Sequence, residues 1–73
     1  MIINRWFCAW PIDRRVVVNL LDGRAFDGLL VDRRGDLLVL GRASLMEPGN
    51  STPVPIDGLV YVERPHVAFL QVP

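Results

Sequence analysis

The chain has 73 residues, so it has room for one domain and not for separate cofactor and substrate domains. Eight arginines balance eight acidic residues and lysine is absent, so the formal net charge is zero and no global positive field gathers nucleic acid. The single cysteine, Cys8, excludes an internal disulfide and a cysteine-based zinc site and is typical of a reducing cytoplasm. Apolar runs are too short to span a bilayer, and we expect no signal peptide.

Residues 1–13 form an apolar N-terminal segment. Trp6 and Trp10 are four residues apart, as are Ile3 and Phe7, so a short helix would gather them into one stripe. An extended strand is the alternative for this segment. We expect Trp6, Phe7 and Trp10 either to cover one end of the domain or to bind a protein partner.

Residues 15–21 are predicted to form the first strand, because three consecutive valines are β-branched. Asp22-Gly23 follows and is a strong hairpin signal. The second strand is predicted over residues 24–32, and Gly28 within it indicates a sharp bend or a bulge. Long strands need such a corner when they close into a small barrel.

The remaining pattern alternates turns with apolar runs. Residues 33–36 are predicted to form a tight turn, and Asp57-Gly58 a bend within the fourth strand. The expected later elements are a third strand at 37–43, a loop at 44–53, a fourth strand at 54–63 and a fifth at 66–72. The sequence therefore predicts one all-β domain over residues 1–73, a five-stranded and strongly bent small barrel with an SH3-like fold.

These residues resemble the Sm/LSm family, which includes bacterial Hfq. Residues 16–28 match the opening of the first Sm signature, with its Asp-Gly turn and its bend glycine. Residues 32–37 are similar to the later part of that signature, with Asp36 where the family usually has asparagine. Residues 62–70 keep the apolar skeleton of the second signature but not its Arg-Gly pair, and the His66 strand resembles the close of Hfq.

The resemblance implies a homo-oligomeric ring, in which edge strands of neighbouring copies pair and bury apolar surface. It also implies a pore that binds single-stranded RNA, often rich in uridine. Carried over by position, the RNA-binding residues are Arg34, Asp36, Arg64 and His66. Arg34 would stack on a base, Asp36 would accept a base N–H, and Arg64 and His66 would contact phosphate, base or ribose.

Other interpretations stay open at this point. Arg34 can be a solvated turn residue, and Asp36 can bond its own backbone, as aspartates in turns often do. A ring with the Sm fold can serve as a structural or protein-interaction element, for example in a phage or a multiprotein assembly. A third possibility is a monomeric SH3-like adaptor whose groove would use Trp6, Trp10 and Tyr61.

No catalytic constellation is visible. The chain has one histidine and one cysteine, and its serines and threonines form no recognisable triad. A phosphate-binding glycine loop is also missing from the sequence. We therefore expect a binding protein rather than an enzyme, with no cofactor and no metal.

Overall fold

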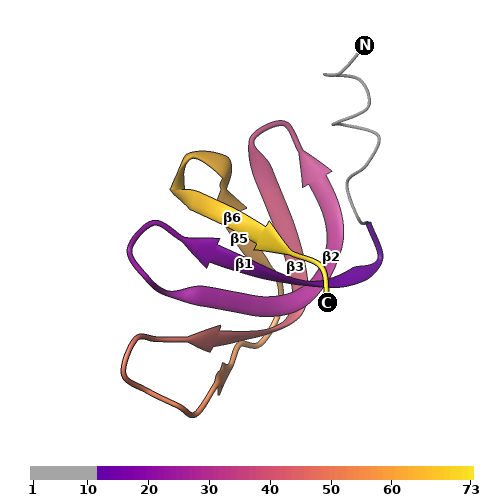
Figure 1. Cartoon of the computed structure of the whole chain (residues 1–73). Helices are drawn as coiled ribbons and strands as arrows, with labels where there is room; N and C mark the ends of the chain where they lie inside the picture. The colour runs from indigo at the N-terminus through magenta and orange to yellow at the C-terminus, as the bar shows by residue number, and fades with distance from the viewer. Residues whose placement is uncertain (1–11) are drawn as a thin grey trace.

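A computed structural model describes residues 12–73, and it consists of six strands and one short 3-10 helix. Figure 1 shows the strands coiling into a small open barrel. Together they make one antiparallel sheet with the order β4-β3-β2-β1-β6, and β5 also pairs with β3. The elements are β1 (Arg14–Leu20), β2 (Ala25–Arg34), β3 (Leu37–Met46), β4 (Val54–Pro55), β5 (Val60–Glu63), η1 (Arg64–His66) and β6 (Val67–Gln71).

The β1–β2 hairpin turns at Asp22-Gly23, as the sequence predicts. Gly23 has a φ of 94°, a left-handed conformation that glycine adopts without the steric cost of a Cβ atom. The Leu20 N–H donates to the Arg24 carbonyl at 2.8 Å and closes the hairpin. The Asp22 carboxylate accepts a hydrogen bond from the Arg24 N–H at 3.0 Å, so the aspartate holds the turn as well.

The bend that makes β2 and β3 wrap into a barrel lies at Gly28. A Cβ atom at this position would lie 3.0 Å from the Gly41 carbonyl oxygen and 3.1 Å from the Ala43 Cα. The pairing register between β2 and β3 shifts beside it, between Asp27 and Leu29. The expected bend glycine is therefore confirmed, and its reason is the close approach of β3 to β2.

Inside the barrel, the inward side chains of β1, β2, β3 and β5 form one apolar core. From Val16 to Leu20, every second residue of β1 is buried, as the alternating pattern of a half-buried strand requires. The fully buried large side chains are Val16, Val18, Leu30, Leu38 and Leu40. Phe26, Val60, Val67 and Leu70 pack against this core from the edges of the barrel.

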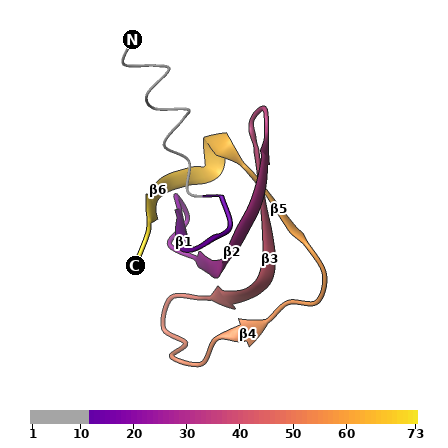
Figure 2. The same cartoon turned by 90° about the vertical axis from the view of Figure 1, so that its right-hand side faces the viewer.

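The fourth strand of the prediction is two strands in the structure. β4 pairs with the end of β3, and β5 pairs with its start, at Leu37 to Leu40. The segment between them bends at Gly58, whose φ is 77°. The expectation of a single strand over 54–63 was wrong because Asp57-Gly58 interrupts the pairing with β3, as Figure 2 shows for the turn between β4 and β5.

Further boundaries differ from the prediction, among them the end of β2, which runs to Arg34 where a turn over residues 33–36 was expected. β3 extends to Met46, so the expected loop at 44–53 begins only after that residue; Ser44 and Leu45 pair with Pro55 and Val54. His66 ends the 3-10 helix and does not open a strand, because Pro65 lies in the first turn of that helix. The predictions for residues 1–11, including Trp6, Phe7, Cys8 and Trp10, lie outside the described residues.

The sheet leaves β5 and β6 with one partner strand each. β5 pairs with β3, and β6 pairs with β1. Figure 1 shows these two strands joined by the short turn of η1. The outer edges of β5 and β6 are therefore unpaired within the described chain.

Candidate functional site

Two turns meet at one end of the barrel, and the four residues predicted to bind RNA lie in these turns or, for Arg34, directly beside one of them. Gly35-Asp36 joins β2 to β3, and η1 joins β5 to β6. The Arg64 N–H donates a hydrogen bond to the Asp36 carbonyl oxygen at 2.6 Å. Leu37 and Glu63, which border these turns, are direct partners in the β3–β5 register. The structure thus brings Asp36 and Arg64 together from positions 28 residues apart in the chain.

The 3-10 helix is also fixed on its other side. The His66 carbonyl accepts a hydrogen bond from the Leu21 N–H at 2.9 Å. The β1–β2 turn and the β2–β3 turn therefore both hold η1 through backbone hydrogen bonds. Such bonds position the turn without using the side chains of Arg64 and His66.

Arg34 closes β2 and points its guanidinium at an acid two residues earlier. Its Nε lies 2.9 Å from Asp32 Oδ2, and the two side chains are 70% and 47% exposed. Asp32 Oδ1 also accepts a hydrogen bond from the Arg33 N–H at 2.7 Å. The hydrogen bonds from Arg34 and from the Arg33 backbone lower the pKa of Asp32, and the Asp32 hydrogen bond raises the pKa of Arg34. Arg34 is therefore an exposed cation with its own counterion.

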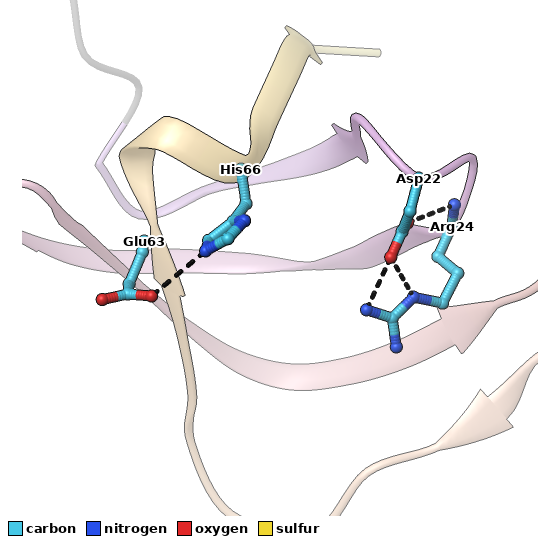
Figure 3. A network of polar contacts seen from close by, with 4 residues as sticks. All are labelled: Asp22, Arg24, Glu63 and His66. Carbon is cyan, nitrogen blue, oxygen red and sulfur yellow. Dashed lines mark hydrogen bonds and ion pairs between the residues drawn. The ribbon is translucent and has the colours of Figure 1, made fainter.

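His66 has an acidic neighbour within its own turn. Its Nε2 lies 3.2 Å from Glu63 Oε1, and both side chains are 68% exposed. Figure 3 shows the imidazole turned toward this carboxylate. When His66 is protonated, this contact becomes an ion pair; when it is neutral, it is a polar contact at the rim of the turn.

Asp32 and Glu63 are acidic partners that the predicted RNA-binding set of Arg34, Asp36, Arg64 and His66 did not include. The available signal was the spacing Asp-x-Arg, which occurs at residues 22–24 and again at residues 32–34. In the first case Arg24 Nε lies 2.8 Å from Asp22 Oδ2, as Figure 3 shows. In both cases the aspartate bonds the arginine side chain and a backbone N–H of the turn or strand that follows.

The two turns are close to neutral as a unit. Residues 32–36 and 63–66 carry three arginines, three acidic residues and His66. Their formal charge is therefore zero with a neutral histidine and +1 with a protonated one. Polyanions are held mainly by uncompensated cations, so this end of one barrel attracts a phosphate chain only weakly.

Large side chains are exposed on β5 and β6, two of the strands that have a free edge. Tyr61 on β5 is 53% exposed, and Phe69 on β6 is 57% exposed. Tyr61, the described residue of the predicted adaptor groove, lies opposite Val39 of β3 in the sheet. Among residues 12–73, no helix is long and apolar enough to cross a membrane, and no three His, Cys, Asp or Glu side chains gather to hold a metal ion.

Neither a family model nor a curated protein sequence matches this chain. Solved structures do match it. The P. aerophilum SmAP1 heptamer is 26% identical with a TM-score of 0.71, and the match covers 84% of this chain and 80% of that one. A heptameric archaeal Sm protein has the same identity and TM-score and covers 84% and 87%.

Two further structures have similar scores. A chain of the NatC complex bound to CoA is 25% identical with a TM-score of 0.74, covering 85% of this chain and 78% of that one. The Pyrococcus abyssii Sm protein in complex with a uridine heptamer is 22% identical with a TM-score of 0.73, covering 99% and 93%. The chain therefore has the small all-β fold of Sm-like proteins and is similar in structure to archaeal Sm proteins.

Proposed function

We propose that this chain forms a homo-oligomeric ring and binds single-stranded RNA at the two joined turns. The observation that carries the proposal is the 2.6 Å hydrogen bond between the Arg64 N–H and the Asp36 carbonyl. It places the two segments that resemble the Sm signatures side by side. One neighbour with this fold is a Pyrococcus abyssii Sm protein in complex with a uridine heptamer, which supports RNA as the ligand class.

Ring assembly is supported by the free edges of the sheet. β4 also lies at an edge of the sheet, but it contains Pro55 and Pro53 precedes it. Because proline has no backbone N–H, this edge is poorly suited to pair with a further strand. β5 and β6 contain no proline and expose Tyr61 and Phe69. Pairing β5 of one copy with β6 of the next would satisfy both edges and close a ring. Two neighbours with this fold are heptamers.

Each predicted residue has a distinct role in the proposed contact. The Arg34 guanidinium offers a plane for stacking on a base and an edge of N–H groups for a neighbouring phosphate, and the Asp36 carboxylate accepts a base N–H. Arg64 contacts phosphate or base, and His66 donates a hydrogen bond to base or ribose. A ring repeats each contact in every copy, so individually weak contacts add up along one RNA strand.

The test is a fluorescence-anisotropy titration with oligo-uridine at low and moderate salt, with oligo-deoxythymidine as the matched control. We expect micromolar or tighter binding that weakens with salt. Arg34→Ala and Arg64→Ala should each weaken it. Lack of binding at low salt, where electrostatic attraction is strongest, would contradict an RNA function.

A second candidate is a protein-interaction subunit of a larger assembly. The neighbour in the NatC complex bound to CoA favours it, as does the near-zero charge of the two turns. In this case the ring or barrel would remain intact without binding RNA. Both candidate functions are binding roles without catalysis, and both place the protein in the cytoplasm. These two points rest on the sequence prediction.

A further inference from the structure

We propose that Asp32 is an internal competitor that sets the RNA affinity of this site by holding the guanidinium of Arg34. The inference rests on the proposed RNA function and deepens it. The carboxylate occupies Arg34 Nε at 2.9 Å, and the pair stands beside the turn that carries Asp36. Asp32 acts through Arg34, so it is a positioning residue and not an RNA contact.

The geometry of the guanidinium explains the competition. Arginine binds phosphate best in a bidentate manner, through two parallel N–H groups along one edge of its plane. The Arg34 Nε–H donates its hydrogen bond to Asp32 Oδ2. A phosphate can therefore bind the guanidinium edge that includes Nε only after the Asp32 carboxylate has moved away. The aspartate also cancels the charge that would draw the phosphate toward Arg34.

Exposure makes the exchange feasible. The Arg34 and Asp32 side chains are 70% and 47% exposed, so water screens their attraction. Such an ion pair breaks readily, so Asp32 competes with the RNA phosphate for Arg34 and does not block its binding altogether. Removing the competitor should therefore strengthen binding by about two- to fivefold, the range that an exposed ion pair contributes to an equilibrium constant.

Asp32→Asn tests this directly, because asparagine keeps the Oδ1 acceptor for the Arg33 N–H and loses only the charge. Asp22→Asn is the matched control. It removes the same charge from the same Asp-x-Arg arrangement, in which Arg24 Nε lies 2.8 Å from Asp22 Oδ2, but in the β1–β2 turn and not beside the β2–β3 turn. Both variants should be checked for folding by circular dichroism and thermal melting.

The measurement is the affinity for oligo-uridine at several salt concentrations. We expect Asp32→Asn to bind about two- to fivefold more tightly than the unmodified chain and Asp22→Asn to bind like it. The magnitude of the slope of log K against log salt should grow by about 0.7 for each phosphate that gains an arginine. Asp32→Asn should give no gain in an Arg34→Ala background.

Two results would overturn the inference while the RNA function stands: equal gains in the two aspartate variants, or a loss of affinity in Asp32→Asn. If neither the unmodified chain nor Asp32→Asn binds RNA although both fold, the RNA function and the inference fail together. A second readout works on the unmodified protein. The NMR signal of Arg34 Nε–H should shift when oligo-uridine displaces Asp32, and an unchanged signal at saturation would contradict the proposal.

Discussion

Arg42 adopts a backbone conformation that L-amino acids rarely take. It lies within β3 with a φ of 48°, next to the bend where Gly28 meets Gly41 and Ala43. A side chain in this left-handed region crowds its own carbonyl oxygen. The strained backbone conformation of Arg42 is tolerated because the sharp bend of β3 requires it.

Arg42→Gly should therefore stabilise the chain by about 0.5–1 kcal/mol, as the relief of strain exceeds the added entropy of the unfolded state. Urea unfolding measures the change. Arg14→Gly is the control, because Arg14 lies in regular strand and glycine there should destabilise by a similar amount. A destabilised Arg42→Gly variant would show that the side chain itself holds the bend.

At the scale of elements, an ion pair joins β1 to β2 on the outer face of the sheet. Arg15 Nη2 lies 2.7 Å from Asp27 Oδ2, and Arg15 Nε also donates to Asp27 Oδ1 at 2.8 Å. The hydrogen bonds from Arg15 lower the pKa of Asp27 below its ordinary value. The folded state therefore holds the proton of Asp27 less tightly than the unfolded state does.

The sign of the pH dependence follows from this lowered pKa. The contribution of Asp27 to stability is fully present above the unfolded pKa of about 3.9 and is lost as pH falls through the lower folded value. We expect Asp27→Asn to cost about 0.5–1 kcal/mol at pH 6, because Arg15 is 71% exposed and the pair is screened. Melting curves should show the stability difference between Asp27→Asn and the unmodified chain shrinking as the pH falls below about 3.9, the pKa of Asp27 in the unfolded chain. A difference that does not change with pH would contradict the role of the carboxylate charge.

The edge strands lead to a prediction about assembly. Phe69 on β6 is 57% exposed, and pairing with β5 of a second copy would bury it beside that copy's strand. Phe69→Glu should therefore shift the oligomer toward monomer while leaving the barrel folded. Light scattering after size-exclusion chromatography measures the shift.

Leu21→Glu is the control for that experiment, because Leu21 is 70% exposed but lies in the β1–β2 turn and not on β5 or β6. Its oligomeric state should remain that of the unmodified chain. Equal dissociation in both variants, or an intact oligomer in Phe69→Glu, would argue against pairing through the β6 edge.

For the whole molecule, the sequence was informative wherever backbone chemistry decides the structure. The β-branched run in β1, the Asp22-Gly23 turn and the Gly28 bend predicted the hairpin and the corner of the barrel. These signals are local, since they depend on steric limits of one or two residues. They suffice to predict a small all-β barrel, and the resemblance to the Sm signatures supplied its kind.

What the sequence did not predict depends on contacts between segments or between side chains. β3 extends to Met46 because Val54 and Pro55 pair with it, which a local pattern does not reveal. Arg34 was predicted as a site cation, but its pairing with Asp32 depends on a side-chain geometry that the structure first displays. The sequence thus did not predict how the side chains around Arg34 pair, while the contact between the Asp36 and Arg64 turns is a backbone feature of the fold.

The central claim is an RNA-binding ring, and native mass spectrometry of the chain mixed with oligo-uridine tests it most directly. One spectrum reports both the number of copies and the bound strand. The account predicts a closed oligomer, a whole multiple of the 8.2 kDa chain, carrying oligo-uridine. A bare monomer, or an oligomer that carries no RNA at low ionic strength, would contradict it.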